Sequence, residues 1–152
     1  MQAASWALMA FWAMVTIGRL LFAALSTKVS VRTIYIVLPF LLAIAFRIVS
    51  RVRTEVGGLF AFGIAGLGCS AFFPLSISLA GDEFPALSSV MSGELIAFYQ
   101  LGYGVAAFGT GPLRNLGGLS FATIFAGASA LAIGMGILAI LILRQMTALS
   151  RR

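Results

Sequence analysis

Histidine is absent from this chain of 152 residues, cysteine occurs once, and only four residues are acidic. Without histidine, the chain lacks the side chain that ordinarily titrates near neutral pH, and a Ser-His-Asp catalytic set cannot form. The single cysteine, Cys69, cannot form an intrachain disulfide, and the sequence has no Cys/His cluster for a metal. It also has no nucleotide-binding glycine-lysine motif. We therefore expect neither an enzyme nor a protein with a cofactor or bound metal.

Charge is scarce as well: 9% of the residues are charged and 61% are hydrophobic. A soluble domain carries about 25% charged residues, so this chain cannot cover itself with polar surface. The apolar stretches do not alternate with polar residues as barrel strands do. The composition predicts an all-α integral membrane protein. The net charge of +6 comes from basic residues that meet anionic headgroups, so we expect the lipid bilayer, and no nucleic acid, as a partner.

Five apolar stretches approach or exceed the roughly 20 residues with which a helix crosses a bilayer. The predicted spans are residues 3–25, 33–50, 56–81, 86–113 and 119–143, all in one domain, 1–152. The second is long enough if Arg47 extends its side chain to the headgroups. The short connections predict that successive helices are antiparallel neighbours.

Basic residues flank both ends of the predicted bundle. One end carries Lys28, Arg32, Arg144, Arg151 and Arg152, and the other Arg47, Arg51, Arg53 and Arg114. The positive-inside rule narrowly favours the first set as cytoplasmic. We therefore expect a multi-pass protein of the plasma (cytoplasmic) membrane whose C-terminus is cytoplasmic.

Small residues recur every fourth position in two of the spans. They are Gly57, Ala61, Ala65 and Cys69 in the third span, and Ala122, Ala126, Ala130 and Gly134 in the fifth. Small residues at this spacing let helices approach closely in a membrane. Both series are predicted to be helix-packing surfaces.

The segment FWAMVTIGRLLFAALSTKVSVR, residues 11–32, resembles a helix and loop of a known family. It is similar to the second helix, and following loop, of a six-helix half in the sugar-permease-like branch of the major facilitator superfamily. The matching residues are Phe11, Trp12, Thr16, Gly18, Arg19, Leu25, Ser26, Lys28 and Arg32. The loop departs from the pattern at Thr27, where an acidic residue is expected, at Ser30 in place of glycine, and at Val31 in place of a basic residue.

Two later segments extend the likeness. GLGCSAFFPLSISLAGDEFP, residues 66–85, resembles the fourth helix of such a half, although Ser88 and Ser89 stand near the position of the usual arginine. GYGVAAFGTGPLRNLGG, residues 102–118, resembles the fifth. The resemblance implies about helices eight to twelve of a C-terminal half, built from inverted three-helix repeats. The missing N-terminal helices would then lie on the same chain or on a partner, which makes this chain a fragment or a truncated product.

The function implied is part of a secondary active transporter that moves a small solute by alternating access, with proton coupling as one possibility. The alternative is a standalone five-span membrane protein that acts as a partner or interaction subunit.

Arg19 stands inside the first span, about two turns before its end. Its side chain either extends to the headgroups or joins a latch between helices. Asp82 and Glu83 end the third span on the same side of the membrane as Lys28 and Arg32. Pairing of these opposite charges predicts a cytoplasmic gate that is closed in one state of the transport cycle.

Glu94 is the one carboxylate well inside a span. An ionisable group at this depth is a functional candidate, and we consider proton coupling. The alternative is a polar contact between helices, with Arg19 or Ser92.

Polar and aromatic side chains lie on one side of the fourth span. They are Tyr99, Gln100, Tyr103 and Thr110, and the third span adds Ser70 and Phe73 as weaker candidates. Such a stripe suits a solute cavity. Hydrogen bonds between helices, together with interfacial tyrosine, are the alternative explanation.

Overall fold

The computed structural model describes residues 2–149, with side chains for residues 4–146, and over this range the chain is helical without strands. The elements are α1 (Gln2–Leu25), α2 (Val31–Val49), α3 (Glu55–Ser70), α4 (Phe72–Glu83), the 3-10 helix η1 (Pro85–Leu87), α5 (Ser88–Asn115) and α6 (Phe121–Leu149). The predicted all-helical fold is confirmed. Arg151 and Arg152, predicted to flank one end of the bundle, lie outside the described residues.

Four stretches of the described chain are long and apolar enough to cross a membrane: α1, α2, the combined α3 and α4, and α6. The fifth predicted span corresponds to α5, which is 28 residues long but more polar than the others. Glu94 and Gln100 are among the residues that lower its hydropathy. A multi-pass membrane protein with four candidate spans is therefore supported, and a fifth crossing stays a prediction.

Hydroxyl side chains begin three of the helices. Ser30 accepts a hydrogen bond from the Thr33 amide at 3.2 Å, at the start of α2. Thr54 does the same for Gly57 at the start of α3. Ser120 plays the same part before α6. Each hydroxyl satisfies one of the amides that a helix leaves without a partner at its N-terminus.

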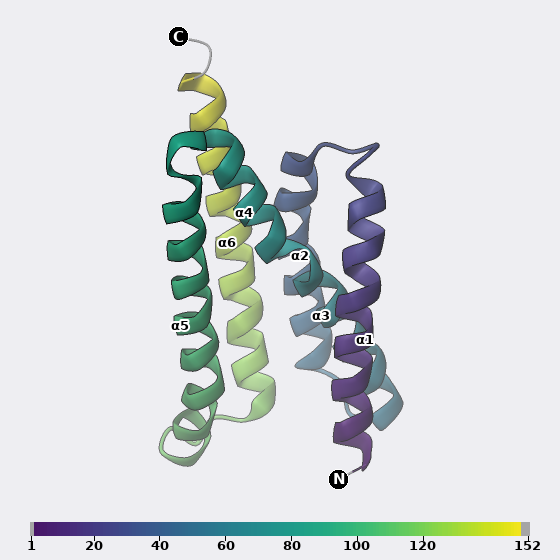
Figure 1. Cartoon of the computed structure of the whole chain (residues 1–152). Coiled ribbons are helices and arrows are strands. Elements are labelled where there is room, and N and C mark those ends of the chain that lie inside the picture. Colours follow the sequence, from purple (N-terminus) through teal and green to yellow (C-terminus); the bar gives the residue numbers. More distant parts are fainter. Residues whose placement is uncertain (1, 150–152) are drawn as a thin grey trace.

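Successive long helices run in opposite directions, and the connections fall at two ends of the bundle (Figure 1). We call the end with the α1–α2 and α4–α5 connections the Lys28 end, and the end with the α2–α3 and α5–α6 connections the Arg51 end. The two basic sets predicted from the sequence, as far as they are described, lie at these two ends. Together, α3 and α4 run diagonally across the bundle, from α1 to α5 (Figure 1).

The closest helix crossing joins α1 to α3 and is made by small residues. Ala61 and Ala65 are 0% and 2% exposed, as the four-residue spacing predicts. A Cβ atom at Gly66 would collide with the backbone of Phe11, and one at Gly18 would lie 2.7 Å from the Ser70 Cβ. Residues of this size are what permit the two backbones to approach.

The second main contact joins α2 to α6, and here the predicted packing surface is wrong. Ala130 and Gly134 are exposed, and α6 instead buries the stripe of Ser129, Ala132, Gly136, Ala139 and Leu143. Most positions on this helix are small or apolar, so spacing alone does not select a face. The face is selected by α2, whose Phe40 ring lies against Gly136.

Helix α5 is the least covered element. It has no buried residue, and its main contact is with α4. A Cβ atom at Gly93 or Gly102 would have no neighbour within 4 Å. The helix therefore presents most of its surface to its surroundings.

Candidate functional site

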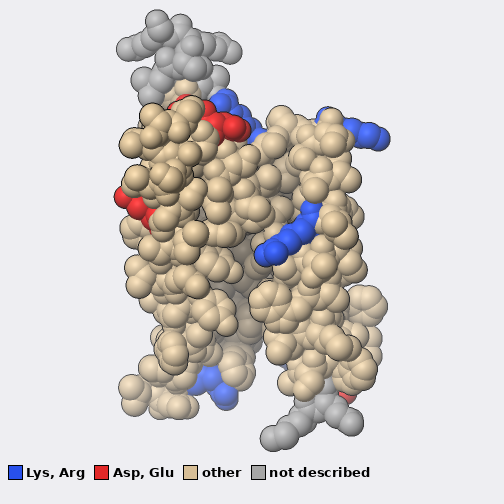
Figure 2. Space-filling view, viewed as in Figure 1, with Lys and Arg blue, Asp and Glu red and all other residues tan. Residues whose placement is uncertain are grey.

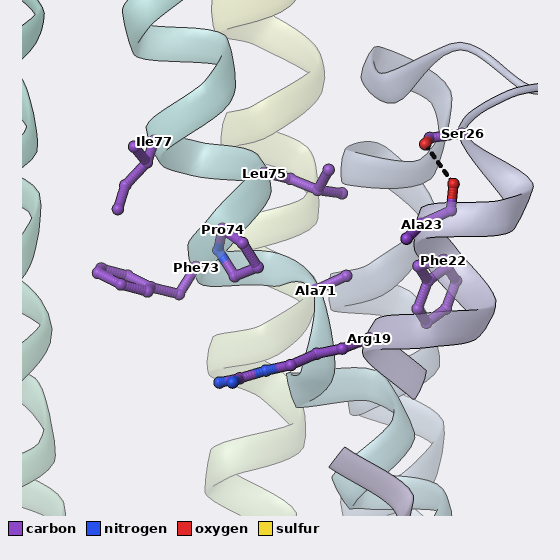
Figure 3. Close-up of a pocket in the computed structure, with 9 residues that line it drawn as sticks. All are labelled: Arg19, Phe22, Ala23, Ser26, Ala71, Phe73, Pro74, Leu75 and Ile77. Carbon is purple, nitrogen blue, oxygen red and sulfur yellow. Dashed lines mark hydrogen bonds between the residues drawn. The ribbon is translucent and has the colours of Figure 1, made fainter. Parts of the chain in front are cut away.

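A pocket of about 430 Å³ opens between α1 and α4. Its α1 wall consists of Arg19, Phe22, Ala23 and Ser26. The opposite wall consists of Ala71, which precedes α4, and of Phe73, Pro74, Leu75 and Ile77 on α4. Figure 3 shows these side chains around the opening. Arg19 is the one charged residue in a lining that is otherwise almost entirely apolar.

The break between α3 and α4 shapes this pocket. The helix leaves regular geometry at Ala71, which has φ −109° and ψ −9°. Pro74 follows in the first turn of α4 and has no amide to donate to the carbonyl of Ser70. The interruption lies where the diagonal helix passes α1, so Phe73 and Pro74 form the wall opposite Arg19 (Figure 3).

The side chain of Arg19 is exposed, and the face of α1 from which it projects follows from its neighbour in the sequence. Gly18 is buried against Ser70, which fixes the rotation of α1 relative to α3. The Arg19 side chain then runs across the opening toward α4, and not along α1 toward Ser26 (Figure 3). Within residues 4–146, no carboxylate pairs with it.

The predicted gate residues are partly brought together. An Arg32 guanidinium nitrogen lies 3.5 Å from a Glu83 carboxylate oxygen, which joins the start of α2 to the end of α4 at the Lys28 end. The side chains of this pair are 48% and 28% exposed. Lys28 and Asp82 are exposed nearby in the chain, and neither is in an ion pair among the described residues.

The predicted cavity stripe divides into separate surroundings. Tyr99 contacts Phe73, with ring centroids 4.8 Å apart, and so lies next to the pocket. Gln100 and Tyr103 are exposed on α5. Thr110 is half-buried and donates a hydrogen bond to the Ala106 carbonyl of its own helix at 2.8 Å.

Ser70 and Glu94 lie away from the pocket lining. Ser70 is 1% exposed, and its hydroxyl donates to the Leu67 carbonyl at 2.7 Å inside the α1–α3 crossing. Glu94 is exposed on α5. The contact considered for it with Ser92 is not formed, because the Ser92 hydroxyl donates to the Ser88 carbonyl. The side chains described include no group of three or more His, Cys, Asp or Glu that could hold a metal.

Two polar contacts between helices were not predicted. The Ser129 hydroxyl of α6 donates to the Ala43 carbonyl of α2 at 2.8 Å, in a buried position. The Ser76 hydroxyl of α4 lies 3.4 Å from the hydroxyl of Tyr35 on α2, whose ring stacks on Phe72. Serines are common along the chain, so the presence of a serine at position 76 or 129 did not by itself predict a contact between helices. Pairing them requires knowing which helices touch.

Many of the charged side chains lie toward the two ends of the molecule, but a basic side chain also projects across the middle of this face and an acidic group lies on its left edge (Figure 2). The same face is hollowed between the half that contains α1 and the half that contains α5 (Figure 2). No family model matches the chain, and neither a curated protein nor a solved structure matches it.

Proposed function

We propose that the chain is part of a secondary active transporter of the major facilitator type, which moves a small solute by alternating access. The observation that carries this proposal is the order of helix packing: α1 packs chiefly on α3, α2 packs on α6, and α5 is left without buried residues. This order is what an incomplete pair of inverted repeats would produce.

Inverted repeats are related by a pseudo-two-fold axis that exchanges their corresponding helices. If the combined α3 and α4, then α5 and α6, form one three-helix repeat, α1 and α2 are the second and third helices of another. Exchanging the repeats maps α2 onto α6 and α1 onto α5. The α2–α6 contact then maps onto itself. The α1–α3 contact maps onto a contact between α5 and a helix that precedes α1, which accounts for the uncovered surface of α5.

The same arrangement supports a fifth crossing. Because α4 ends at the Lys28 end and α6 begins at the Arg51 end, the chain must pass between the two ends along α5 (Figure 1). A polar, uncovered helix is tolerated at membrane depth where it meets other protein or a water-filled cavity. We propose that α5 meets both, in the complete bundle.

The Arg32–Glu83 pair is proposed as the latch at the Lys28 end. An exposed ion pair contributes only about 0–1 kcal/mol to stability. A difference of that size still alters the populations of two states several-fold, because 1.4 kcal/mol is a factor of ten. Its contribution therefore lies in the balance between open and closed states and not in holding the fold.

The latch is tested by measuring solute uptake in cells that express the native-length product. Glu83→Gln is expected to reduce uptake several-fold, and the exchange Arg32→Glu with Glu83→Arg to restore part of it. Asp82→Asn reports whether the adjacent carboxylate shares the role. Glu55→Gln, at the opposite end, is the matched control. Uptake unchanged in Glu83→Gln would remove the latch.

Proton coupling through Glu94 is a separate part of the proposal. If the carboxylate carries the coupled proton, Glu94→Gln abolishes accumulation driven by a pH gradient while exchange of solute down its own gradient continues. Gradient-driven accumulation that persists in this variant would exclude coupling through Glu94.

The uncovered surface of α5 also favours a second candidate, an interaction subunit that acts by binding another membrane protein. The mass of the native product distinguishes the two. An epitope after Arg152 at the genomic locus gives a band near 16.0 kDa for a five-span subunit. A band of about 40 kDa or more, the size of twelve spans of about 20 residues with loops, supports the transporter.

A further inference from the structure

The pocket beside Arg19 combines three features. It is open enough for a ligand, it is walled by apolar side chains, and it contains one cationic group. Ligand sites commonly measure about 300–1,000 Å³ and place a few polar groups in an apolar lining. The volume of about 430 Å³ suits a small organic molecule.

The direction of the Arg19 side chain is the decisive feature. A guanidinium that serves only to reach headgroups would extend along α1 toward the Lys28 end, where Ser26 lies. Instead it crosses the opening toward Phe73 and Pro74 (Figure 3). It does so without a carboxylate partner among the side chains described.

A guanidinium has five donors in a planar fork, which matches the two oxygens of a carboxylate or phosphate. At membrane depth such a charge requires a counter-charge or water. The rest of the lining, which includes Phe22 on α1 and Ile77 on α4, is almost entirely apolar. It offers too few hydrogen-bond acceptors for the five donors of the guanidinium. A ligand that complements this lining has an anionic group attached to an apolar carbon skeleton.

We propose that this pocket binds a small organic anion, with its carboxylate or phosphate paired to Arg19 and its carbon body between Phe22 and Phe73. This inference rests on the proposed transport function and names the substrate class. It narrows the small solute expected from the sequence to an organic anion. The contact of Phe73 with Tyr99 places the predicted aromatic stripe at the edge of the same site.

A thiol at the rim of the pocket tests the proposal. The reporter is Ser26→Cys in a Cys69→Ser background, in the native-length protein reconstituted in phosphatidylcholine vesicles. The control is Thr27→Cys, which lies outside the lining. The two hydroxyls are matched, because each donates to the carbonyl three residues earlier at 2.7 Å. Both thiols are labelled with anionic sulfonatoethyl methanethiosulfonate and with its cationic trimethylammonioethyl counterpart.

We expect the ratio of anionic to cationic labelling rates at Ser26→Cys to fall roughly five-fold in Arg19→Gln, as loss of one nearby charge predicts, and to be kept in Arg19→Lys. The ratio at Thr27→Cys, which lies outside the lining and farther from Arg19, should change less. Benzoate should slow labelling of Ser26→Cys in the Arg19 protein and lose this effect in Arg19→Gln, whereas benzamide, its neutral counterpart, should have no effect. Protection by neither compound, or by both equally, overturns the proposal.

Two further measurements distinguish a lipid headgroup from a solute as the bound anion, and failure of the site from failure of the transport proposal. If phosphatidylglycerol in the vesicles slows labelling and benzoate does not, Arg19 binds a lipid headgroup and the solute site is rejected. Benzoate protection in a protein that shows no uptake upholds the site and rejects transport. If solute uptake is unchanged in Arg19→Gln and benzoate does not slow labelling, the transport proposal is upheld and the site is rejected.

Discussion

The α1–α3 crossing makes a strong prediction about Gly66. A Cβ atom at this position would collide with the carbonyl oxygen of Phe11. It would lie 3.0 Å from the carbonyl carbon and 3.1 Å from the Cα atom of the same residue. Ordinary contacts between carbon atoms are about 3.5–4.0 Å. The neighbour is backbone and cannot rotate away, so Gly66→Ala must push α1 and α3 apart. A separation of about 0.5–1 Å loses a quarter to a half of each contact's attraction.

Overpacking of this kind costs about 1–3 kcal/mol, whereas alanine gains about 0.8–1 kcal/mol over glycine from helix propensity. Gly102→Ala is the matched control, because it has the same propensity gain and no neighbour within 4 Å. The gain cancels in the comparison. Gly66→Ala should therefore be less stable than Gly102→Ala by about 1–3 kcal/mol.

The assay is unfolding of the two variants in mixed micelles, with increasing mole fraction of dodecyl sulfate and circular dichroism as the readout. Midpoints give the difference in the free energy of unfolding. Equal midpoints for the two variants would refute the close approach of α1 to α3. They would also remove the support that this contact gives to the inverted-repeat arrangement.

Three smaller effects follow from other contacts, measured by the same titration. Gly136→Ala should be less stable than Gly102→Ala by about 1 kcal/mol, at the low end of overpacking, because the tip of the Phe40 ring can shift away; a difference equal to that of Gly66→Ala would contradict this. Ser129→Ala loses the buried hydrogen bond to the Ala43 carbonyl and should cost about 0.6 kcal/mol, and no more than about 1.7. Glu83→Gln should change the free energy of unfolding by less than about 1 kcal/mol, because the ion pair is exposed, and a larger loss would show that the pair supports the fold.

The helical segments were predictable because each depends on local signals. Ser30 and Thr54 cap helices where their types suggest. The small-residue spacing in α3 correctly identified Ala61 and Ala65 as buried. The same reasoning failed on α6, because nearly every face of that helix is small or apolar. Only the partner helix determines which face is covered.

The candidate site was predictable only in its parts. Arg19 stands out in the sequence as a charge in an apolar run, and Phe73 was a weaker candidate for the cavity. Their meeting across one pocket depends on the rotation of α1 set by Gly18 and on the interruption at Ala71. The rotation arises from tertiary packing, which residue type and spacing do not encode, whereas Pro74 contributes locally to the interruption. The Arg32–Glu83 pair was among the predicted combinations, but the sequence could not choose it over Lys28 and Asp82.

The polarity of α5 has a consequence for how the chain is made. Carboxylate and amide side chains at the centre of a helix disfavour its release from the translocon into lipid. Without buried residues of its own, α5 receives little compensation from the helices described here. In the proposed five-span arrangement, entry of α5 into the membrane would therefore depend on a later helix or a partner that shields it. In that arrangement, failure of α5 to enter would make α6 insert in the reverse sense or not at all. If α5 crosses as proposed, the least apolar of the long helices would govern the topology of α6 after it.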